Sequence, residues 1–394
     1  MPELSLYWDA DDDVEGIRRY TTGGFHPVRL GDVVSSRGTS TAAIADSPSR
    51  QYRILHKLGH GAFATVWLAD ALHEPSQRYV ALKICAADAD SGHELDIFSR
   101  LSHHESKAPN VVQLRDSFSI QGPNGLHAVL VQDVLGSLLS VVRSLSGPKH
   151  ARSLCRQIAY LHAGNVGISL PSLNGHSPRE ILDYFGQPEC TIILPTEPPA
   201  LPQSLPPYLV PPISVIDYLA NNDPAFMERP LQAEILDLGN AIVVHEQTRE
   251  SFTPAAVFGQ PPLTRASDIW SLACTIYELA FGARLFHFAA QNDALLGAMA
   301  TLCGEVPREW RSYWDSRERL RNMSVSHETA DAEWQRRLEH LTTIPGTTLT
   351  EAEVDEIFAL LRSMLKIDPE CRASAEDVLS HPWFTCDHDS GTSG

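Results

Sequence analysis

The chain has 394 residues, 43% of them hydrophobic, which is enough apolar material for a large buried core and excludes a disordered protein. It carries 49 acidic and 31 basic residues, which gives a net charge of −18. This charge argues against direct binding to nucleic acid and favours basic partners, although the need for a soluble surface explains an acidic charge equally well. No run reaches the roughly 18 apolar residues of a membrane helix, so no membrane partner is expected. The seven cysteines are scattered without a C-x-x-C pair, which indicates reduced thiols. We expect a monomer in the cytoplasm, and the sequence leaves open whether it also enters the nucleus.

Residues 1–51 are polar and are expected to form an N-terminal extension, partly disordered, with one ordered patch around 20–28. The stretch from Tyr52 to Asp70 then predicts a strand, a tight turn and a returning strand. Gly59 and Gly61 in this turn let the backbone approach an anion without a side chain in the way, and Phe63 could cover its tip. By itself this pattern is also typical of an ordinary hairpin.

The next predicted strand, 79–85, carries Lys83 within an apolar run, where a charge is costly to bury unless an anion meets it. A lysine on an edge strand that points into solvent is the alternative. The following segment, 91–101, has apolar residues at helical spacing and places Glu94 where it can face Lys83, unless Glu94 is an ordinary solvated carboxylate. Two more strands, at 111–114 and 126–134, would complete a small antiparallel sheet.

After Gly136 the pattern changes to helices, which predicts a lobe boundary at 133–136 and a helix over 151–162. Residues 171–230 hold 13 of the 27 prolines, too many for regular structure, and are expected to be a long insertion with extended pieces such as 206–210.

Beyond the insertion, a short apolar strand delivers Asp237 to a glycine turn. An apolar helix follows over 267–281 and ends at Gly282, and a later helix over 351–366 begins with a capping box at Thr350 and Glu353.

A glycine hairpin, a strand lysine, a helix glutamate, Asn165 and a turn aspartate are, in that order, the parts needed to hold a nucleoside triphosphate with magnesium. Lys83 would neutralise the α- and β-phosphates, Glu94 would orient Lys83, and Asp237 with Asn165 would bind Mg²⁺ through oxygen atoms.

With these parts in place, the sequence resembles the eukaryotic protein-kinase fold, and within it the SR-protein kinase family in its fungal form. The resemblance covers roughly residues 20–385. The residues that carry it are Gly23-Gly24-Phe25-His26-Pro27-Val28, Leu58-Gly59-His60-Gly61-Ala62-Phe63-Ala64-Thr65-Val66-Trp67-Leu68-Ala69, Leu135-Gly136, Asp237-Leu238-Gly239-Asn240-Ala241, Asp268-Ile269-Trp270-Ser271 and His381-Pro382-Trp383-Phe384.

The resemblance implies an α+β, two-lobed fold, with a small antiparallel-sheet lobe at 52–134, a larger helical lobe at 135–385 that includes the insertion 171–230, and a tail at 386–394. It also implies ATP and Mg²⁺ as cofactors, and transfer of phosphate to serine in basic Arg/Ser-rich proteins of mRNA processing.

The resemblance also assigns residues to the nucleotide site. Gln132 would lie behind the adenine pocket, and Asp133 to Leu135 would form the hinge. The full set of expected nucleotide-binding residues is Leu58, Gly59, His60, Gly61, Ala62, Phe63, Ala64, Val66, Ala81, Lys83, Gln132, Asp133 and Leu135, with Asn165 and Asp237 as metal ligands.

Two departures from the family pattern bear on activity. In the family, a catalytic loop of the form H-R-D-L-x-x-x-N supplies an aspartate base, yet no Asp or Glu occurs from Val134 through Arg179, and the residues before Asn165 run from a helix into the loop end as if the loop had been removed. The family's Ala-Pro-Glu segment is also absent at 253–258, which would leave its partner Arg372 without a counter-ion.

Three interpretations follow. The first is a serine/threonine kinase whose gaps are defects of the sequence as written, such as mis-set exon boundaries. The second is a pseudokinase that binds nucleotide or acts as a scaffold, and the third is a small-molecule phosphotransferase, against which the helix at Trp270 and the His381-Pro382-Trp383 end argue. For the chain as printed we expect little or no phosphoryl transfer, since a positioned base contributes about 10²–10⁴-fold to the rate.

Overall fold

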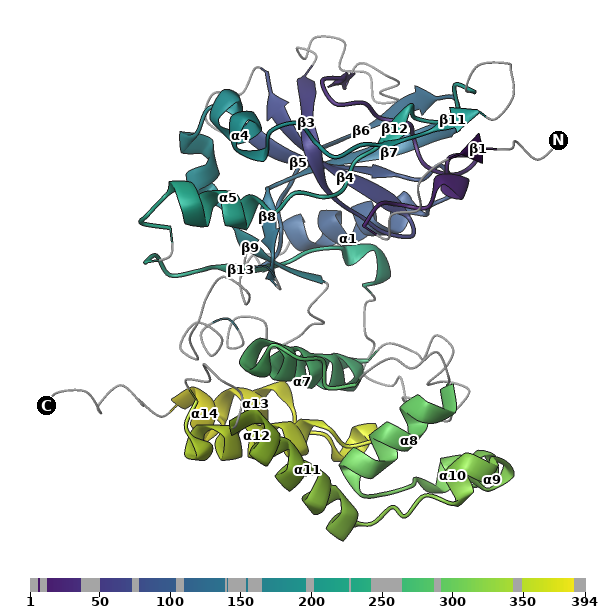
Figure 1. The fold of residues 1–394 in the computed structure, drawn as a ribbon, viewed down its shortest axis with the longest axis vertical. Helices are drawn as coiled ribbons and strands as arrows, with labels where there is room; N and C mark the ends of the chain where they lie inside the picture. Colours follow the sequence, from purple (N-terminus) through teal and green to yellow (C-terminus); the bar gives the residue numbers. More distant parts are fainter. Residues whose placement is uncertain are drawn as a thin grey trace, which may run out of the picture. The chain divides into compact units, whose positions relative to one another are not determined.

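The structure is a computed structural model of the chain. It describes residues 6–7, 13–36, 50–72, 78–103, 110–138, 140, 154, 165–195, 202–226, 228–241, 264–286, 292–342 and 349–385. The chain divides into two compact units, which we call the sheet unit (Met1–Ser140, Gly167–Pro230 and Leu236–Ala241) and the helical unit (Val141–Val166, Leu231–Ile235 and Ile242–Gly394) (Figure 1). Among the described residues, no helix is long and apolar enough to cross a membrane.

A six-stranded antiparallel sheet forms the centre of the sheet unit, with the order β2-β3-β4-β5-β7-β6. Strands β2 to β7 span, in chain order, Val33–Ser35, Gln51–His60, Ala64–Ala71, Tyr79–Cys85, Leu114–Gly122 and Gly125–Gln132. The predicted strand at 111–114 is wrong, because pairing with β7 begins only at Leu114 and continues to Gly122. β6 is an edge strand whose side chains are half-buried or exposed and none fully buried, a pattern that a search for apolar runs does not detect.

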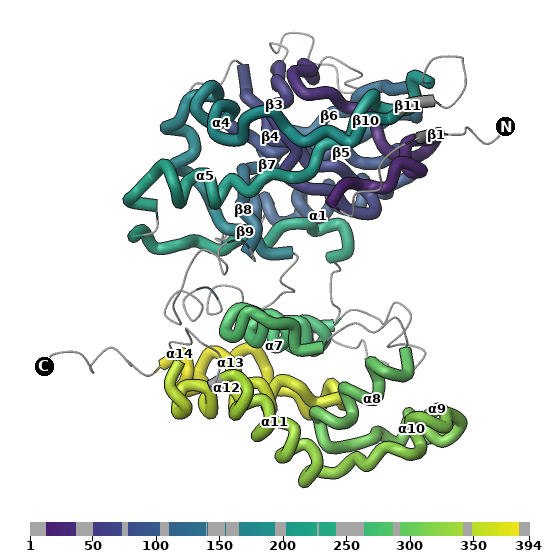
Figure 2. The backbone as a smooth tube through the Cα atoms, in the orientation of Figure 1, coloured from purple at the N-terminus to yellow at the C-terminus, as the bar shows by residue number. Residues whose placement is uncertain are grey.

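The two faces of this sheet carry different side chains, as the alternation of a β-strand requires. One face, which we call the outer face, carries an apolar cluster that includes Trp67, Leu82 and Val131. Val28 from the N-terminal extension and Val210 from the insertion pack into the same cluster. Figure 2 shows the teal trace of the insertion running across the sheet. The outer face is therefore buried by two segments that are remote from it in sequence.

The insertion 171–230 contains regular structure, contrary to the expectation from its prolines. Its elements are η3 (Pro171–Gly175), α4 (Pro178–Phe185), β10 (Thr191–Ile192), β11 (Leu194–Pro195), β12 (Tyr208–Leu209) and α5 (Val215–Asn222). The prolines are accommodated because Pro171 and Pro178 occupy the first turn of their helices, where a missing N–H breaks no hydrogen bond. The insertion also groups with the sheet unit rather than with the helical residues of the large lobe to which we assigned it.

The N-terminal extension packs against the insertion. β1 (Leu6–Tyr7) pairs with β11, and η1 (Ile17–Arg19) begins a segment whose apolar side chains form a second cluster with Leu205 and Leu209. Beside it, Lys57 of β3 forms an ion pair with Glu15, and both side chains are almost completely buried. The Tyr20 hydroxyl donates a hydrogen bond to the same carboxylate.

Several helices of the helical unit begin at a side-chain cap. Its described helices are α7 (Arg265–Phe281), α8 (Asn292–Cys303), η5 (Arg308–Trp310), α9 (Arg311–Ser316), α10 (Glu318–Arg321), α11 (His327–Thr342), α12 (Glu351–Met364), η6 (Pro369–Cys371), α13 (Ala375–Ser380) and α14 (Pro382–Thr385). The predicted capping box at Thr350 and Glu353 is confirmed, and so is the end of α7 at Gly282, which adopts a left-handed conformation with φ 66°.

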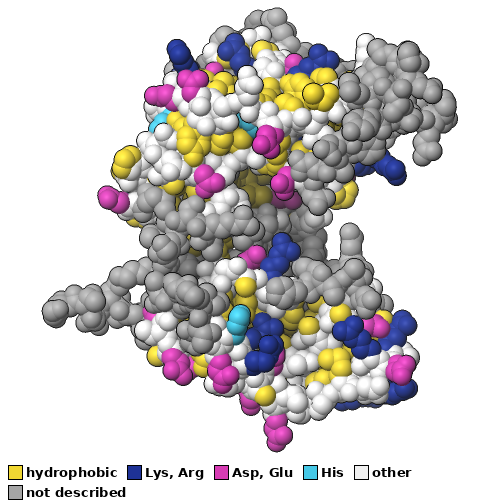
Figure 3. All heavy atoms as spheres, viewed as in Figure 1, with side chains coloured by type: hydrophobic (Ala, Val, Ile, Leu, Met, Phe, Trp, Pro, Cys, Tyr) yellow, Lys and Arg dark blue, Asp and Glu magenta, His cyan; other side chains and the backbone are white. Residues whose placement is uncertain are grey.

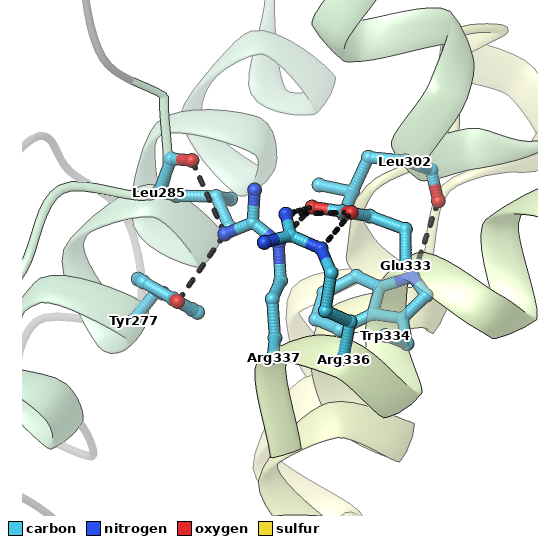
Figure 4. Close-up of polar contacts among 7 residues, drawn as sticks. All are labelled: Tyr277, Leu285, Leu302, Glu333, Trp334, Arg336 and Arg337. Atoms are coloured by element: carbon cyan, nitrogen blue, oxygen red, sulfur yellow. Dashed lines mark hydrogen bonds and ion pairs between the residues drawn. The ribbon is translucent and has the colours of Figure 1, made fainter. Parts of the chain in front are cut away.

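Polar contacts of α11 join it to its neighbours (Figure 4). Arg337 donates to the Tyr277 hydroxyl at 3.2 Å and to the Leu285 carbonyl at 3.4 Å, and Glu333 accepts from Arg337 at 2.8 Å. The Trp334 indole N–H donates to the Leu302 carbonyl at 3.1 Å. These bonds satisfy polar groups that packing would otherwise leave buried without partners.

Candidate nucleotide-binding site

Lys83 on β5 lies between two carboxylates. Its Nζ is 2.8 Å from both carboxylate oxygens of Glu94, on helix α1 (Ser91–His103), and 2.7 Å from Oδ1 of Asp237. Burial alone would lower the pKa of Lys83, but the charges of Glu94 and Asp237 outweigh it and raise the pKa above its ordinary value. The predicted approach of Glu94 to Lys83 is thus confirmed, and the lysine is held charged.

Asp237 lies in a turn with an unusual backbone. It follows β13 (Ala233–Ile235) and precedes η4 (Leu238–Asn240), and its φ of 60° is the only positive value of a non-glycine residue in the described part of the chain. An aspartate tolerates this left-handed conformation better than most residues because its side chain is short and polar. His93 Nε2 donates a hydrogen bond of 2.7 Å to the Ala241 carbonyl, which ties helix α1 to the end of this turn. Nothing in the sequence except its place beside Glu94 pointed to His93.

The glycine hairpin is formed by β3 and β4, with Gly59 opposite Val66 and the Gly61 N–H donating to the Ala64 carbonyl at 2.9 Å. The tip, from His60 to Phe63, is exposed, and the Phe63 side chain is 64% accessible. A Cβ atom added to Gly59 or to Gly61 would meet no described atom within 4 Å, so there is open space at both glycines. This space is what a phosphate-covering hairpin needs.

The expected base-binding residues lie on adjacent strands. Ala81 of β5 is directly opposite Gln132 of β7, and Lys83 is opposite Leu130, so Ala81, Lys83 and Gln132 share the face of the sheet that meets Glu94. The Gln132 side chain is buried, and its Nε2 has no hydrogen-bond partner among the described residues. Asp133, the next residue, pairs with Arg115 at 2.8 Å.

A cavity of about 210 Å³ adjoins the hinge. Leu58 near the end of β3 and Leu135 of β8 (Leu135–Ser137) both line it, and their contact with a nucleotide stays a prediction. The insertion contributes a further set of lining residues, which sequence reasoning missed: Pro212, Ile213, Ser214 and Val215. No sequence signal could have placed them there, because their contacts are made with residues about 80 to 150 positions earlier.

Several known proteins are similar to this chain in sequence or in fold. Residues 231–384 match the protein kinase domain. Over 95% of its length the chain is similar to the serine/threonine-protein kinase SRPK of Physarum polycephalum, with 28% identity over 92% of that protein. The chain has a protein kinase domain of the SR-protein-kinase type.

The likeness of this kinase domain extends to other relatives. The serine/threonine-protein kinase SKY1 of Saccharomyces cerevisiae is 34% identical over 40% of this chain and 22% of its own length. SRSF protein kinase 3 of Homo sapiens is 33% identical over 35% of this chain and 23% of its own length. The crystal structure of the PF14_0431 kinase domain has the same fold, with a TM-score of 0.50 and 16% identity over 84% of this chain and 95% of that one. The predicted α+β protein-kinase fold is confirmed.

The structure describes only some of the other residues that the kinase pattern singles out. Asn165 is half-buried and belongs to the helical unit, whereas Asp237 belongs to the sheet unit, so their joint binding of Mg²⁺ stays a prediction. The expected helix at 151–162 with the region of the missing catalytic loop, the segment 253–258 and the tail 386–394 lie outside the described residues, apart from residue 154.

The sequence predicts that the guanidinium of Arg372 is buried without a compensating partner in this kinase domain, but the structure supplies several partners. Its guanidinium donates to the carbonyls of Lys366 at 2.6 Å, Ala266 at 2.8 Å and Ile367 at 3.1 Å, and it lies over the Trp270 ring at 5.2 Å. Carbonyl oxygens and an aromatic face can compensate the burial of a guanidinium. The expectation of an uncompensated Arg372 was therefore wrong.

Proposed function

We propose that this kinase domain binds ATP with Mg²⁺ and that, in the chain as printed, it transfers the phosphoryl group poorly or not at all. The observation that carries the proposal is the position of Lys83 between Glu94 and Asp237, below a glycine hairpin with open space at its turn. Of the three side chains, Asp237 is the most exposed, at 45%. Its carboxylate is therefore the one that can turn toward a metal ion.

The donor set suits a magnesium nucleotide. Lys83 is kept charged and can donate hydrogen bonds to phosphate oxygens in place of Asp237, while Glu94 continues to hold its ammonium group. Asp237 offers the hard oxygen ligand that Mg²⁺ prefers. When bound, Mg-ATP supplies the phosphoryl group, and the metal offsets the charge that develops on it. Leu58, Ala81, Gln132 and Leu135 would surround the base.

What the sequence lacks is the base that would accept the proton of the substrate hydroxyl. A general base contributes about 10²–10⁴-fold, or roughly 3–5 kcal/mol of barrier, and loss of the loop removes substrate positioning as well. No Asp or Glu between Val134 and Arg179 can replace it. The same observation supports the second candidate function, a pseudokinase that binds nucleotide or acts as a scaffold.

The substrate class that we infer is basic Arg/Ser-rich protein. The similarity to SR-protein kinases supports it, and the net charge of −18 gives a long-range attraction for a basic chain. On the face drawn in Figure 3, the coloured Asp and Glu side chains are scattered among Lys and Arg rather than gathered in one patch. The overall charge therefore supports encounter, and it does not locate a docking surface.

Calorimetric titration with Mg-ATP tests nucleotide binding. The unmodified chain should bind, and ligand at 100 times its dissociation constant should stabilise the fold by about 2.7 kcal/mol. Asp237→Asn should abolish the dependence of affinity on magnesium, while Arg53→Met, which removes an exposed charge on β3, should bind like the unmodified chain. Absence of binding at millimolar nucleotide would refute the proposal.

A further inference from the structure

One wall of the cavity beside the hinge belongs to the insertion and not to the part of the chain that carries the kinase motifs. Of its nine lining residues, five come from β3 and the hinge region, and Pro212, Ile213, Ser214 and Val215 come from the insertion. The four consecutive residues form the segment that we call the insertion wall. The wall faces Leu58 and Leu135, which the sequence pattern assigns to the nucleotide base.

The insertion wall is held at both ends. At its start, the Ile213 N–H donates to the Lys57 carbonyl at 2.9 Å, which fixes it to the residue before Leu58. At its end, Ser214 caps α5 by accepting a hydrogen bond from the Asp217 N–H at 3.3 Å. The first turn of α5 packs on β8, because two carbon atoms of the Ile216 side chain lie 2.3 Å from where a Cβ of Gly136 would be. The wall is thus attached to the two strands that bound the cavity.

The residues that line the cavity are chemically compatible with a nucleoside. Leu58, Leu135, Ile213 and Val215 supply apolar surface, which suits the faces of a heteroaromatic ring. Ser137, Ser140 and Ser214 supply hydroxyl groups, which can both donate and accept hydrogen bonds with a sugar. The described residues that line it include neither a lysine nor an arginine, which favours Lys83 rather than this cavity as the place for phosphates.

We propose that the insertion wall is part of the nucleotide-binding site, and that it determines the affinity for the nucleoside portion of the ligand. This inference rests on the proposed function. The insertion then has a binding role inside its own sheet unit, in addition to covering the outer face of the sheet.

Two probes separate the wall from the phosphate site, namely Mg-ATP and adenosine, which has no phosphate. Ile213→Trp fills the cavity from the wall and should weaken both probes by about tenfold or more, since it displaces the ring that the cavity would hold. Lys83→Met should weaken Mg-ATP by about tenfold or more and leave adenosine within about twofold, because only the phosphates need the ammonium group. Ala225→Trp adds the same side chain at an exposed position of the same insertion and should change neither affinity.

The measurement is calorimetric titration of each full-length variant, with a thermal melt to show that it is folded. If Ile213→Trp proves unfolded, Ile213→Ala decides, and it should weaken adenosine about three- to tenfold by removing apolar contact. Normal affinity of a folded Ile213 variant for adenosine would overturn the inference and leave the proposed function standing. If the unmodified chain binds neither probe, the proposed function fails and this inference with it. The crossed pattern, in which Lys83→Met affects one probe and Ile213→Trp affects both, supports both proposals.

Discussion

The ammonium group of Lys83 forms an ion pair with Glu94, whose side chain is only 4% exposed. A buried carboxylate is stable as an ion only while its partner remains, because desolvation of an unpaired charge is costly. The contact with Asp237 is of a different kind, since that carboxylate is nearly half exposed and water can replace the lysine. The two ion pairs of one side chain therefore have different tasks, one structural and one available for exchange with a ligand.

The first prediction concerns this difference. Lys83→Met should lower the free energy of unfolding of the sheet unit by about 3 kcal/mol, because it leaves Glu94 buried without its cation. Urea unfolding measures the change. The double variant Lys83→Met/Glu94→Leu should recover most of the loss, whereas Lys83→Met/Asp237→Leu should not. Equal recovery in both double variants would contradict the division of roles.

At the scale of elements, a histidine pair joins the N-terminal extension to the sheet. The rings of His26 and His127 of β7 lie edge to face with centroids 4.9 Å apart, and His127 Nδ1 donates to the Cys85 carbonyl at 3.0 Å. His26 Nδ1 and His127 Nε2 have no hydrogen-bond partner among the described residues. Burial, and then the neighbouring His127, lower the pKa of His26 from 6.5 to about 4, and burial lowers the pKa of His127 as well.

The second prediction follows from the sign of this shift. A histidine whose pKa is depressed in the folded state contributes full stability above pH 6.5, where both states are neutral, and the contribution is lost between pH 6.5 and about 4, where only the unfolded state takes up the proton. His26 alone should account for about 3 kcal/mol over that interval. Urea unfolding from pH 7.5 to 4.5 should show a shallower fall for His26→Asn than for the unmodified chain. Parallel curves would show that His26 does not titrate as its burial implies.

The third prediction concerns the joint between α5 and β8. A Cβ at Gly136 would lie 2.3 Å from two carbon atoms of the Ile216 side chain, so Gly136→Ala should cost about 1–3 kcal/mol of unfolding free energy by overpacking. Ile216→Ala should cost about 2–4 kcal/mol by leaving a cavity. The double variant should cost less than the sum, because each change relieves the other. Gly175→Ala is the matched control, since its Cβ would meet no described atom within 4 Å, and strict additivity of the Gly136 and Ile216 changes would contradict the contact.

At the scale of the whole molecule, the fourth prediction separates a damaged kinase from a pseudokinase. The chain as printed should not label an Arg/Ser repeat peptide. Insertion of a family-type loop with its aspartate between His162 and Ala163, together with an Ala-Pro-Glu segment near Ala255, should raise labelling by about 10²–10⁴-fold if the defect lies only in the missing segments.

The control for this repair is the same loop with asparagine in place of the aspartate, which keeps the chain length and removes the base. An inactive double repair would indicate a pseudokinase whose pocket has changed elsewhere. A further outcome is that the unrepaired chain labels the peptide, with the labelling lost in Asp237→Ala. That outcome would refute both interpretations, because it would require a base that the sequence does not supply between Val134 and Arg179.

The sequence predicted the parts of the site whose chemistry is local. Lys83 stood out because a charge interrupts an apolar strand, and Asp237 because it follows a short strand at a glycine turn. The burial of Lys57 against Glu15 and the insertion wall could not be predicted, because each depends on which distant segment covers the sheet. The regular helices of the insertion were missed for a different reason, since proline counts alone do not show that a proline stands at the first turn of a helix.

The packing of the insertion on the outer face of the sheet also determines when this face becomes buried during synthesis. β3, β4 and β5 leave the ribosome well before the insertion residues that cover this unit. Of these residues, Val210 packs on the outer face of the sheet, and Leu205 and Leu209 pack on the N-terminal extension. Until those residues emerge, the nascent chain holds an apolar sheet surface exposed to the cell, the condition under which intermediates aggregate or recruit chaperones. Contacts between segments this far apart also slow the search for the native state. A pause in translation before the insertion should therefore lower the yield of folded protein more than a pause of equal length placed after it.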